Sequence, residues 1–350
     1  MNVLSLFDGI SCGLVALKRN NIPIQNYYAC EIDKYAIKIS KHNHPEIQHL
    51  GSVVGLVPPK NIDLLIGGSP CQDLSIAKKG RKGLDGERSG LFWEYVRILK
   101  ECNPKYFILE NVNSMSKESK QTITEALGVE PIMIDASLVS AQSRKRLFWT
   151  NISVKGLPKD KGILLKDILQ DAEVDDRMVS NGKSYTLTAS YNGAIVENSI
   201  KRKQRTMVIT KFTKSKEKFT PITRKLGYIG DKDHQATRLY DTEGKAPALN
   251  VVCNNGLIRI KELEKSTGQA HRVYGIESKS PTLSNGGGGL IKTDFIRKLT
   301  PIECERLQGL PDDYTKEVSN TQRYKCLGNA FNVDVICFIL GFINNGTQFS

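Results

Sequence analysis

The residue best placed for covalent chemistry in this chain of 350 residues is Cys71. It follows Gly67-Gly68-Ser69-Pro70, and an apolar run at 62–66 that is typical of a buried strand comes directly before. This frame predicts a thiol on a rigid turn at the carboxyl end of a strand, which is where open α/β sheets bind ligands. A cysteine that only fills a core needs no such frame, so the pattern favours a nucleophile.

A second apolar run, at 106–109, ends in the same way and is followed by Glu110-Asn111-Val112. The two strand ends would therefore bring a thiol and a carboxylic acid to one substrate. Further along the chain, Arg144 and Arg146 lie two apart on a piece that reads as extended, so both side chains are expected to point to the same side.

A glycine turn follows the first predicted strand, in Phe7-Asp8-Gly9-Ile10-Ser11-Cys12-Gly13. Only Gly9 and Gly13 match a glycine-rich loop, so this segment by itself leaves a dinucleotide-binding oxidoreductase open. Glu31 comes at the end of the second predicted strand, where an acid can accept hydrogen bonds from ribose hydroxyls.

Taken in order, these motifs resemble those of the DNA cytosine-5 methyltransferases, and the resemblance covers most of the chain. Residues 1–150 look closest to the mammalian de novo enzymes, whereas the long middle segment looks like the target recognition region of bacterial and phage members. The motifs that carry the resemblance are Phe7-Asp8-Gly9, Glu31, Ser69-Pro70-Cys71-Gln72, Glu110-Asn111-Val112, Gln142-Ser143-Arg144-Lys145-Arg146, Leu307-Gln308-Gly309 and Gly328-Asn329.

The resemblance implies transfer of a methyl group from S-adenosylmethionine to carbon 5 of a cytosine flipped out of duplex DNA. Cys71 would add to carbon 6 and Glu110 would bond ring nitrogen 3, with Asn111 and Val112 holding it in place. Arg144 and Arg146 would engage the cytosine carbonyl and a neighbouring phosphate. For removal of the carbon 5 proton the sequence offers no obvious side chain, so a water molecule is the candidate base.

The same resemblance implies an S-adenosylmethionine site in which Glu31 binds the ribose and Ile32 and Phe7 cover the adenine. One position departs from the family, because Ser52 follows Gly51 where an acid is usual, so we expect weaker cofactor binding. The cofactor residues implied are Phe7, Asp8, Gly9, Ile10, Ser11, Cys12, Glu31, Ile32, Ser52, Val53, Ser69, Pro70, Asn329 and Ala330.

The net charge of +13 is unevenly distributed, since residues 151–300 hold 27 Lys and Arg against 16 Asp and Glu. Beside a site for a nucleobase, such an excess favours a surface that follows phosphates over a merely solvated face. The basic, glycine-rich stretch 78–90 reads as a lid that closes on DNA. The predicted DNA contacts are Gln72, Ser75, Arg81, Lys82, Arg88, Lys201, Arg202, Lys203 and Arg205.

Strands and helices alternate through the first 150 residues, which predicts an α/β fold with a doubly wound, mostly parallel sheet. This is the Rossmann-like fold of S-adenosylmethionine-dependent methyltransferases. We expect a catalytic and cofactor-binding domain at 1–150 plus 325–350, ending in an apolar helix at 331–343 opened by Gly328-Asn329. A smaller β-rich target recognition domain is expected at 151–324, with 296–314 at the junction.

Composition limits the partners. Eight scattered cysteines without a Cys-x-x-Cys pair argue against a metal site and a disulfide scaffold, and no apolar run or leader indicates a membrane. We expect a monomer in the cytoplasm of a prokaryotic cell or phage-infected host, acting on double-stranded DNA, with a cognate restriction endonuclease as a further candidate partner.

Two alternatives remain open: a transfer RNA cytosine-5 methyltransferase, and a catalytically silent DNA-binding relative. The long basic segment argues against the first alternative, because the RNA-methylating branch lacks one. The intact Cys71, Glu110, Arg144 and Arg146 argue against the second.

Overall fold

The computed structural model describes residues 1–70, 91–210, 225–228, 238–240 and 295–345. Contacts divide the chain into two compact units. The first unit comprises Met1–Ile168, Val179–Gly193 and Leu299–Ser350, and the second comprises Leu169–Met178 and Ala194–Lys298. Each unit is described separately below.

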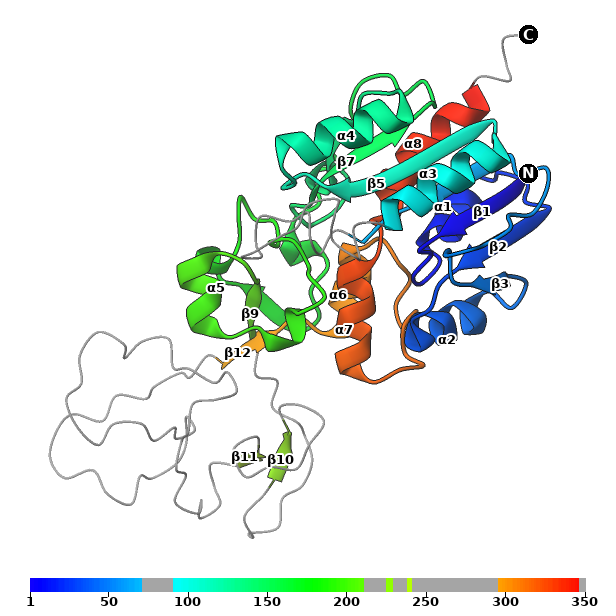
Figure 1. Ribbon diagram of the computed structural model, residues 1–350. Coiled ribbons are helices and arrows are strands. Elements are labelled where there is room, and N and C mark those ends of the chain that lie inside the picture. Colours follow the sequence, from blue (N-terminus) through cyan, green and yellow to red (C-terminus); the bar gives the residue numbers. More distant parts are fainter. Residues whose placement is uncertain (71–90, 211–224, 229–237, 241–294, 346–350) are drawn as a thin grey trace, which may run out of the picture. The chain divides into compact units, whose positions relative to one another are not determined.

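The first unit is built on a seven-stranded sheet in the order β3-β2-β1-β4-β5-β7-β6 (Figure 1). Strands β1 to β5 are parallel, and β7 is antiparallel to both of its neighbours. The strands are β1 (Asn2–Leu6), β2 (Asn26–Cys30), β3 (Gln48–Gly51), β4 (Leu64–Gly67), β5 (Tyr106–Val112), β6 (Ile132–Asp135) and β7 (Lys145–Thr150). The strand order reverses between β1 and β4, and such a reversal opens a crevice at the carboxyl ends of the strands.

Helices cover both faces of this sheet, which confirms the predicted doubly wound α/β fold (Figure 1). One face packs against α3 (Leu91–Cys102) and α4 (Lys117–Leu127), where Phe92, Tyr95 and Ile123 are fully buried against strand residues. The other face carries α1 (Cys12–Arg19) and α8 (Val333–Asn345), which contact each other, and α2 (Lys34–Asn43) follows β2. The chain ends thus build one unit, because α8 packs beside the helix that follows β1.

The carboxyl-terminal helices differ from the sequence expectation. Gly328 and Asn329 do not open the last helix; they end α7 (Asn320–Asn329), and α8 starts four residues later. The break has a local cause, because the Asn332 side chain accepts a hydrogen bond from the Val335 amide at 3.1 Å and so caps α8. The segment Asn320–Ile343 is apolar enough by composition to span a membrane, yet 61% of its most apolar window is buried inside the molecule.

The second unit is β-rich in its described part. A three-stranded antiparallel sheet has the order β12-β9-β8, and β10 pairs with β11 in a hairpin. Its elements are β8 (Ala172–Val174), α5 (Val196–Arg202), β9 (Met207–Thr210), β10 (Lys225–Tyr228), β11 (Arg238–Tyr240) and β12 (Phe295–Lys298).

Segments 151–168, 179–193 and 299–324, which the sequence grouped with target recognition, pack within the first unit. The Leu299 amide donates to the Tyr191 hydroxyl at 2.8 Å, and the Tyr324 hydroxyl donates to the Leu299 carbonyl at 2.8 Å. These bonds tie residues far apart in the chain into the first unit, which includes α6 (Pro301–Leu307). Which segments recognise DNA stays a prediction.

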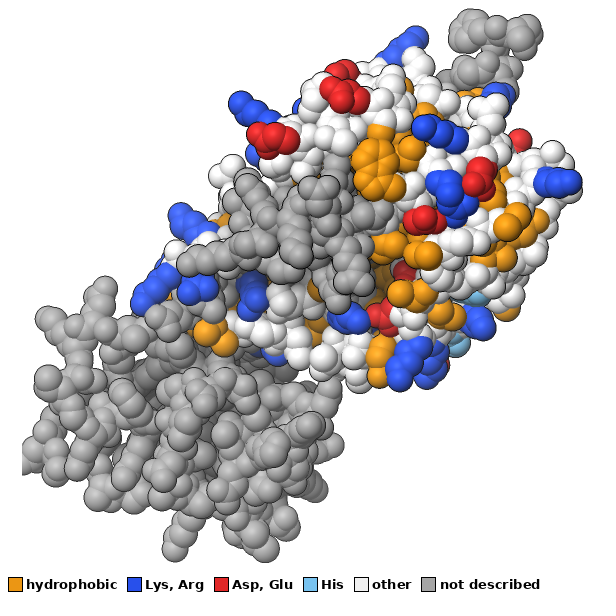
Figure 2. Space-filling model, in the orientation of Figure 1, with side chains coloured by type: hydrophobic (Ala, Val, Ile, Leu, Met, Phe, Trp, Pro, Cys, Tyr) orange, Lys and Arg blue, Asp and Glu red, His pale blue; other side chains and the backbone are white. Residues whose placement is uncertain are grey.

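Surface charge is mixed on the described part of the face that Figure 2 shows, where basic and acidic side chains are interspersed. The basic excess of the sequence falls within 151–300, and much of that range, including 211–224 and 241–294, lies outside the described residues.

Candidate active site

The end of β4 brings the chain that leads to Cys71 against the acid on β5. Gly68 has almost no room for a side chain, because a Cβ there would lie 2.7 Å from Phe331 and 3.2 Å from the Glu110 carboxylate. The neighbouring Gly67 is equally tight, since a Cβ would lie 2.9 Å from the Leu6 carbonyl. Only glycine fits this close approach, which explains the pair of glycines before the predicted nucleophile. Cys71 itself, the 78–90 stretch and the contacts predicted at Gln72, Ser75, Arg81, Lys82 and Arg88 lie outside the described residues.

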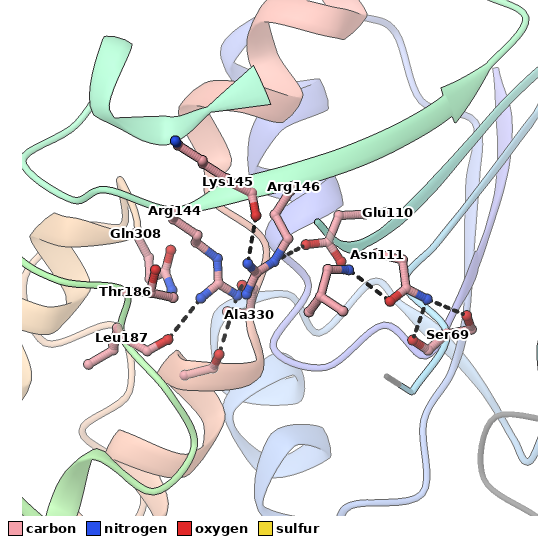
Figure 3. A network of polar contacts seen from close by, with 12 residues as sticks. Ser69, Glu110, Asn111, Arg144, Lys145, Arg146, Thr186, Leu187, Gln308 and Ala330 are labelled. Atoms are coloured by element: carbon pink, nitrogen blue, oxygen red, sulfur yellow. Dashed lines mark hydrogen bonds and ion pairs between the residues drawn. The ribbon is translucent and has the colours of Figure 1, made fainter. Parts of the chain in front are cut away.

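Asn111 anchors the turn before Cys71. Its side-chain amide donates to the Ser69 hydroxyl at 3.1 Å and to the Ser69 carbonyl at 3.4 Å (Figure 3). Its own oxygen accepts the Val112 amide at 2.8 Å, and the residue is 1% exposed. A buried amide with all these partners has one orientation. The sequence assigned Asn111 to hold Glu110, whereas the observed bonds hold Ser69, two residues before Cys71.

Glu110 is paired with Arg146. Nε of Arg146 lies 2.8 Å from Oε1 of Glu110, and the two side chains are 16% and 14% exposed (Figure 3). The pairing follows from the sheet, because β5 and β7 are neighbours and Val112 lies opposite Arg146. A second donor of the guanidinium, Nη1, is held by the Lys145 carbonyl at 2.9 Å. The acid is therefore oriented by a guanidinium that is itself held in place.

Arg144 has a different environment. It is 4% exposed, and its guanidinium donates to the carbonyls of Leu187 at 2.8 Å, Ala330 at 2.9 Å and Gly328 at 3.3 Å. It also lines the small cavity that Glu110, Arg146 and Phe331 border. The observed bonds join three backbone segments. A contact of Arg144 with substrate stays a prediction.

Two amides that sequence reasoning gave no role tie the same segments together. Gln142 is fully buried, accepts the Leu187 amide at 2.7 Å and donates to the Leu307 carbonyl at 3.3 Å. Gln308 is also fully buried and donates to the Leu327 carbonyl at 2.7 Å. Buried amides without a charge partner must find backbone groups, and the signal available in the sequence was the place of both glutamines in the motifs Gln142-Ser143-Arg144-Lys145-Arg146 and Leu307-Gln308-Gly309.

The cofactor turn is built by left-handed backbone and by Glu31. Phe7, Gly9 and Ser11 have φ angles of 57°, 61° and 62°, which fold the chain sharply between β1 and α1. The Glu31 carboxylate accepts the amides of Gly9 at 2.9 Å, Ile32 at 2.7 Å and Asp33 at 2.8 Å. A carboxylate has about four acceptor positions, so one remains for a ribose hydroxyl.

Asp8 supports this turn from the inside. It is 5% exposed, and its carboxylate accepts the hydroxyls of Tyr27 at 2.7 Å and Ser11 at 2.5 Å. Burial raises the pKa of Asp8, and these hydroxyl bonds partly offset that effect. Asp8, Ser11 and the buried Cys12 therefore form the base of the turn, with the buried Ile10 between them.

The other predicted cofactor residues lie at the carboxyl ends of neighbouring strands, with one group at the end of α7. Ile32 is 77% exposed beside Glu31, which is the apolar surface that an adenine would cover. Ser52 is exposed, and its hydroxyl accepts the Val54 amide at 3.1 Å, whereas Val53 is buried in the core. Asn329 is exposed and Ala330 buried at the end of α7. Because β2, β1 and β4 are adjacent, these residues fit an S-adenosylmethionine site. Each assignment stays a prediction.

The predicted phosphate contacts in the second unit lie at and after the end of α5. Lys201, Arg202 and Lys203 are exposed and Arg205 is half-buried. No group of three or more metal-ligating side chains occurs among the residues that the structure describes.

Comparison with known proteins places these features in a family. The family model of the C-5 cytosine-specific DNA methylases matches residues 1–345. The orphan methyltransferase M.SPRI of Bacillus phage SPR is 26% identical over 423 residues, covering 96% of this chain and 95% of that protein. The type II methyltransferase M.HhaI of Haemophilus parahaemolyticus is 28% identical, with coverage of 100% and 96%.

Solved structures add a likeness of fold. The Entamoeba histolytica methyltransferase EhMeth superposes with a TM-score of 0.60 at 15% identity, covering 99% of this chain and 98% of the other. The S. pombe Dnmt2 methyltransferase gives 0.54 at 16% identity, with full coverage of both chains. At these identities the likeness shows the fold alone.

Proposed function

The chain belongs to the C-5 cytosine-specific DNA methylase family and is a DNA cytosine-5 methyltransferase, and we propose that it acts through a covalent adduct of Cys71 with a flipped-out cytosine. The observation that supports this most is the approach of Gly68 to Glu110. Gly68, three residues before Cys71, thus lies beside the Glu110 carboxylate, which Arg146 contacts at 2.8 Å.

Each protein group has one task in this proposal. The Cys71 thiolate forms a bond to carbon 6 of cytosine, and the electron pair displaced from the ring double bond makes carbon 5 nucleophilic. Glu110, which must carry a proton for this step, donates a hydrogen bond through that proton to ring nitrogen 3 and so stabilises the charge that develops there. After methylation a base, for which we propose a water molecule, takes the carbon 5 proton, and the bond to sulfur breaks to release the thiolate.

The cofactor proposed is S-adenosylmethionine, which supplies an electrophilic methyl group when it is bound. Glu31 would accept a ribose hydroxyl bond, Ile32 would lie against adenine, and Asn329 would face the methionine end. The base must leave the duplex to reach the thiol, at a cost of a few kcal/mol, and residues of the basic segments would hold the phosphates. The phage and type II relatives are consistent with action in a prokaryotic cell or a phage-infected host.

Methyl transfer and adduct trapping test this proposal together. Radiolabelled methyl groups should pass from S-adenosylmethionine to duplex DNA and not to transfer RNA. On DNA with 5-fluorocytosine at the target, the wild type should remain covalently bound, because the group on carbon 5 cannot leave as a proton.

Cys71→Ser should abolish both results while keeping DNA affinity, since an alkoxide is not available at neutral pH. Cys102→Ser serves as the matched control, because Cys102 is a free, half-buried thiol at the end of α3 and should retain both activities. Normal turnover of the Cys71→Ser variant, or a covalent adduct formed by that variant, would contradict the mechanism.

A further inference from the structure

The guanidinium of Arg97, in the middle of α3, uses all five of its N–H donors. Nε and Nη2 bond the Glu94 carboxylate at 3.2 and 2.8 Å, and Nη1 bonds Glu101 at 2.9 Å. The remaining two N–H groups point away from α3 and donate to the carbonyls of Leu56 at 3.0 Å and Val53 at 3.3 Å. An arginine with five donors satisfied in a fixed fork holds its partners in one geometry.

The segment that Arg97 holds is the connection between β3 and β4, directly after Gly51. It turns at 53–56, where the Leu56 amide donates to the Val53 carbonyl at 3.2 Å and Gly55 has a φ of 70°. Val53 is 5% exposed and lies in the core, whereas Val54 is 61% exposed. Among the described residues, Arg97 is the one outside this segment whose side chain bonds carbonyls of the segment.

The same helix supports the strand that leads to the nucleophile. Tyr95 is fully buried, and a Cβ on Gly67 would lie 3.1 Å from its ring. One face of α3 thus packs under the end of β4 while Arg97 fixes the turn after β3. Both strand ends lie at the edge of the sheet where cofactor and substrate are expected to bind.

We infer that Arg97 is a positioning residue for cofactor binding, because it fixes the turn at 53–56 directly after Ser52, a predicted cofactor residue. The inference rests on the proposed S-adenosylmethionine site. The two acids keep the guanidinium aimed at the turn, being one helical turn before and after it at i−3 and i+4. Lysine cannot replace this arrangement, because a single ammonium group cannot bond two carboxylates and two carbonyls in a plane.

The test compares Arg97→Ala and Arg97→Lys with the wild type in calorimetric binding of S-adenosylmethionine and in methyl transfer at saturating cofactor. Loss of two hydrogen bonds from a charged donor should raise the Kd of Arg97→Ala about tenfold, or about 1.4 kcal/mol. Arg97→Lys should lie between the two, because it restores part of the bonding, and kcat at saturating cofactor should stay within about twofold. Lys100→Ala, an exposed position on the same helix, is the matched control and should change neither quantity.

A role confined to folding would lower kcat and thermal midpoint together and leave the Kd of the folded fraction unchanged, and that result would overturn the inference. An unchanged Kd in a stable Arg97→Lys would do the same, so the test holds even where Arg97→Ala does not fold. Failure of the proposed function shows itself separately, as a wild type that binds S-adenosylmethionine but does not methylate DNA.

Discussion

Two arginines of one motif, two residues apart, have different partners. Arg146 lies in β7 beside β5, so its guanidinium meets Glu110. Arg144 precedes that strand, and its guanidinium lies among the carbonyls of Leu187, Gly328 and Ala330. The first arrangement orients an acid and the second joins backbone segments, which leads to different expectations for mutation.

Replacing Glu110 with glutamine should lower turnover by two or more orders of magnitude, because an amide cannot give up a proton to ring nitrogen 3, and losing one transition-state stabilising group costs about 2.7–4 kcal/mol in comparable sites. Affinity for S-adenosylmethionine should change little, which calorimetry can measure beside single-turnover methylation. Glu125→Gln, on the exposed face of α4, is the matched control and should behave as wild type. Weak cofactor binding with normal turnover would instead assign Glu110 to the cofactor site.

Replacing Arg144 with alanine should destabilise the fold, since it leaves three carbonyls without their donor and each buried unsatisfied group costs about 1–3 kcal/mol. The expected loss is at least about 2 kcal/mol in the free energy of unfolding in urea. Arg146→Ala should lose turnover with a smaller loss of stability. A stable but inactive Arg144→Ala would show that Arg144 acts on the substrate rather than on the backbone.

At the scale of elements, close backbone approaches hold the site together. A Cβ on Gly328, near the end of α7, would lie 2.1 Å from the Thr188 carbonyl carbon, so segment 184–189 can pack there only against glycine. The turn after β1 is also held by a chain of hydrogen bonds that runs from Lys18 in α1 through His44, directly after α2, to Tyr314. There His44 lies 3.1 Å from both Lys18 Nζ and the Tyr314 hydroxyl, and that hydroxyl donates to the Ile10 carbonyl at 2.8 Å.

This chain of bonds predicts a pH dependence of stability. Burial, and then the Lys18 charge, lower the pKa of His44 to about 4, while Glu46 opposes the shift. The folded pKa is below the ordinary value, so the unfolded chain takes up the proton first, and stability is lost as pH falls from about 6.5 towards 4. At pH 5 the loss should be about 2 kcal/mol relative to pH 7.5, measured by urea unfolding.

His44→Gln should flatten this dependence, whereas the exposed His42, replaced in the same way, should leave it unchanged. An identical slope in His44→Gln and wild type would assign the acid sensitivity to other groups.

At the scale of the whole molecule, the two compact units do not follow the chain in two simple halves. Residues 179–193 belong to the first unit, although segments of the second unit come before and after them. Leu187, the partner of Arg144 and Gln142, lies in this segment. An exchange of recognition segments between relatives should therefore leave residues 179–193 in place.

A chimera that replaces both parts of the second unit, 169–178 and 194–298, should methylate the site of the donor relative. Both parts are needed, because β8 and β9 pair across them. A wider exchange of 151–298 should lower the thermal midpoint and activity, since it also replaces segment 179–193, which contains Leu187, one of the three partners of Arg144. Bisulfite sequencing of DNA from expressing cells identifies the methylated sequence. A chimera of 169–178 and 194–298 that still methylates the original sequence would show that the second unit does not determine the target.

The sequence alone determined the fold class and the family. Strand and helix periodicity, the glycine pair before Cys71 and the acid after the 106–109 run are local patterns, and local patterns are written in consecutive residues. The sequence pattern also predicts helices at 12–20, 34–42 and 91–101, and α1, α2 and α3 match these bounds to within one residue. The short strand β3 was missed, because Gln48–Gly51 shows no apolar alternation.

Only the tertiary structure decided which groups meet. Glu110 and Arg146 are 36 positions apart, Arg144 and Ala330 are 186 apart, and Arg97 and Val53 are 44 apart. Every residue carries a carbonyl oxygen, so no residue type marks the ones that an arginine will bind. The sequence therefore predicts which side chains are reactive, while the packing of strands and turns determines which side chains contact each other and which hold the backbone.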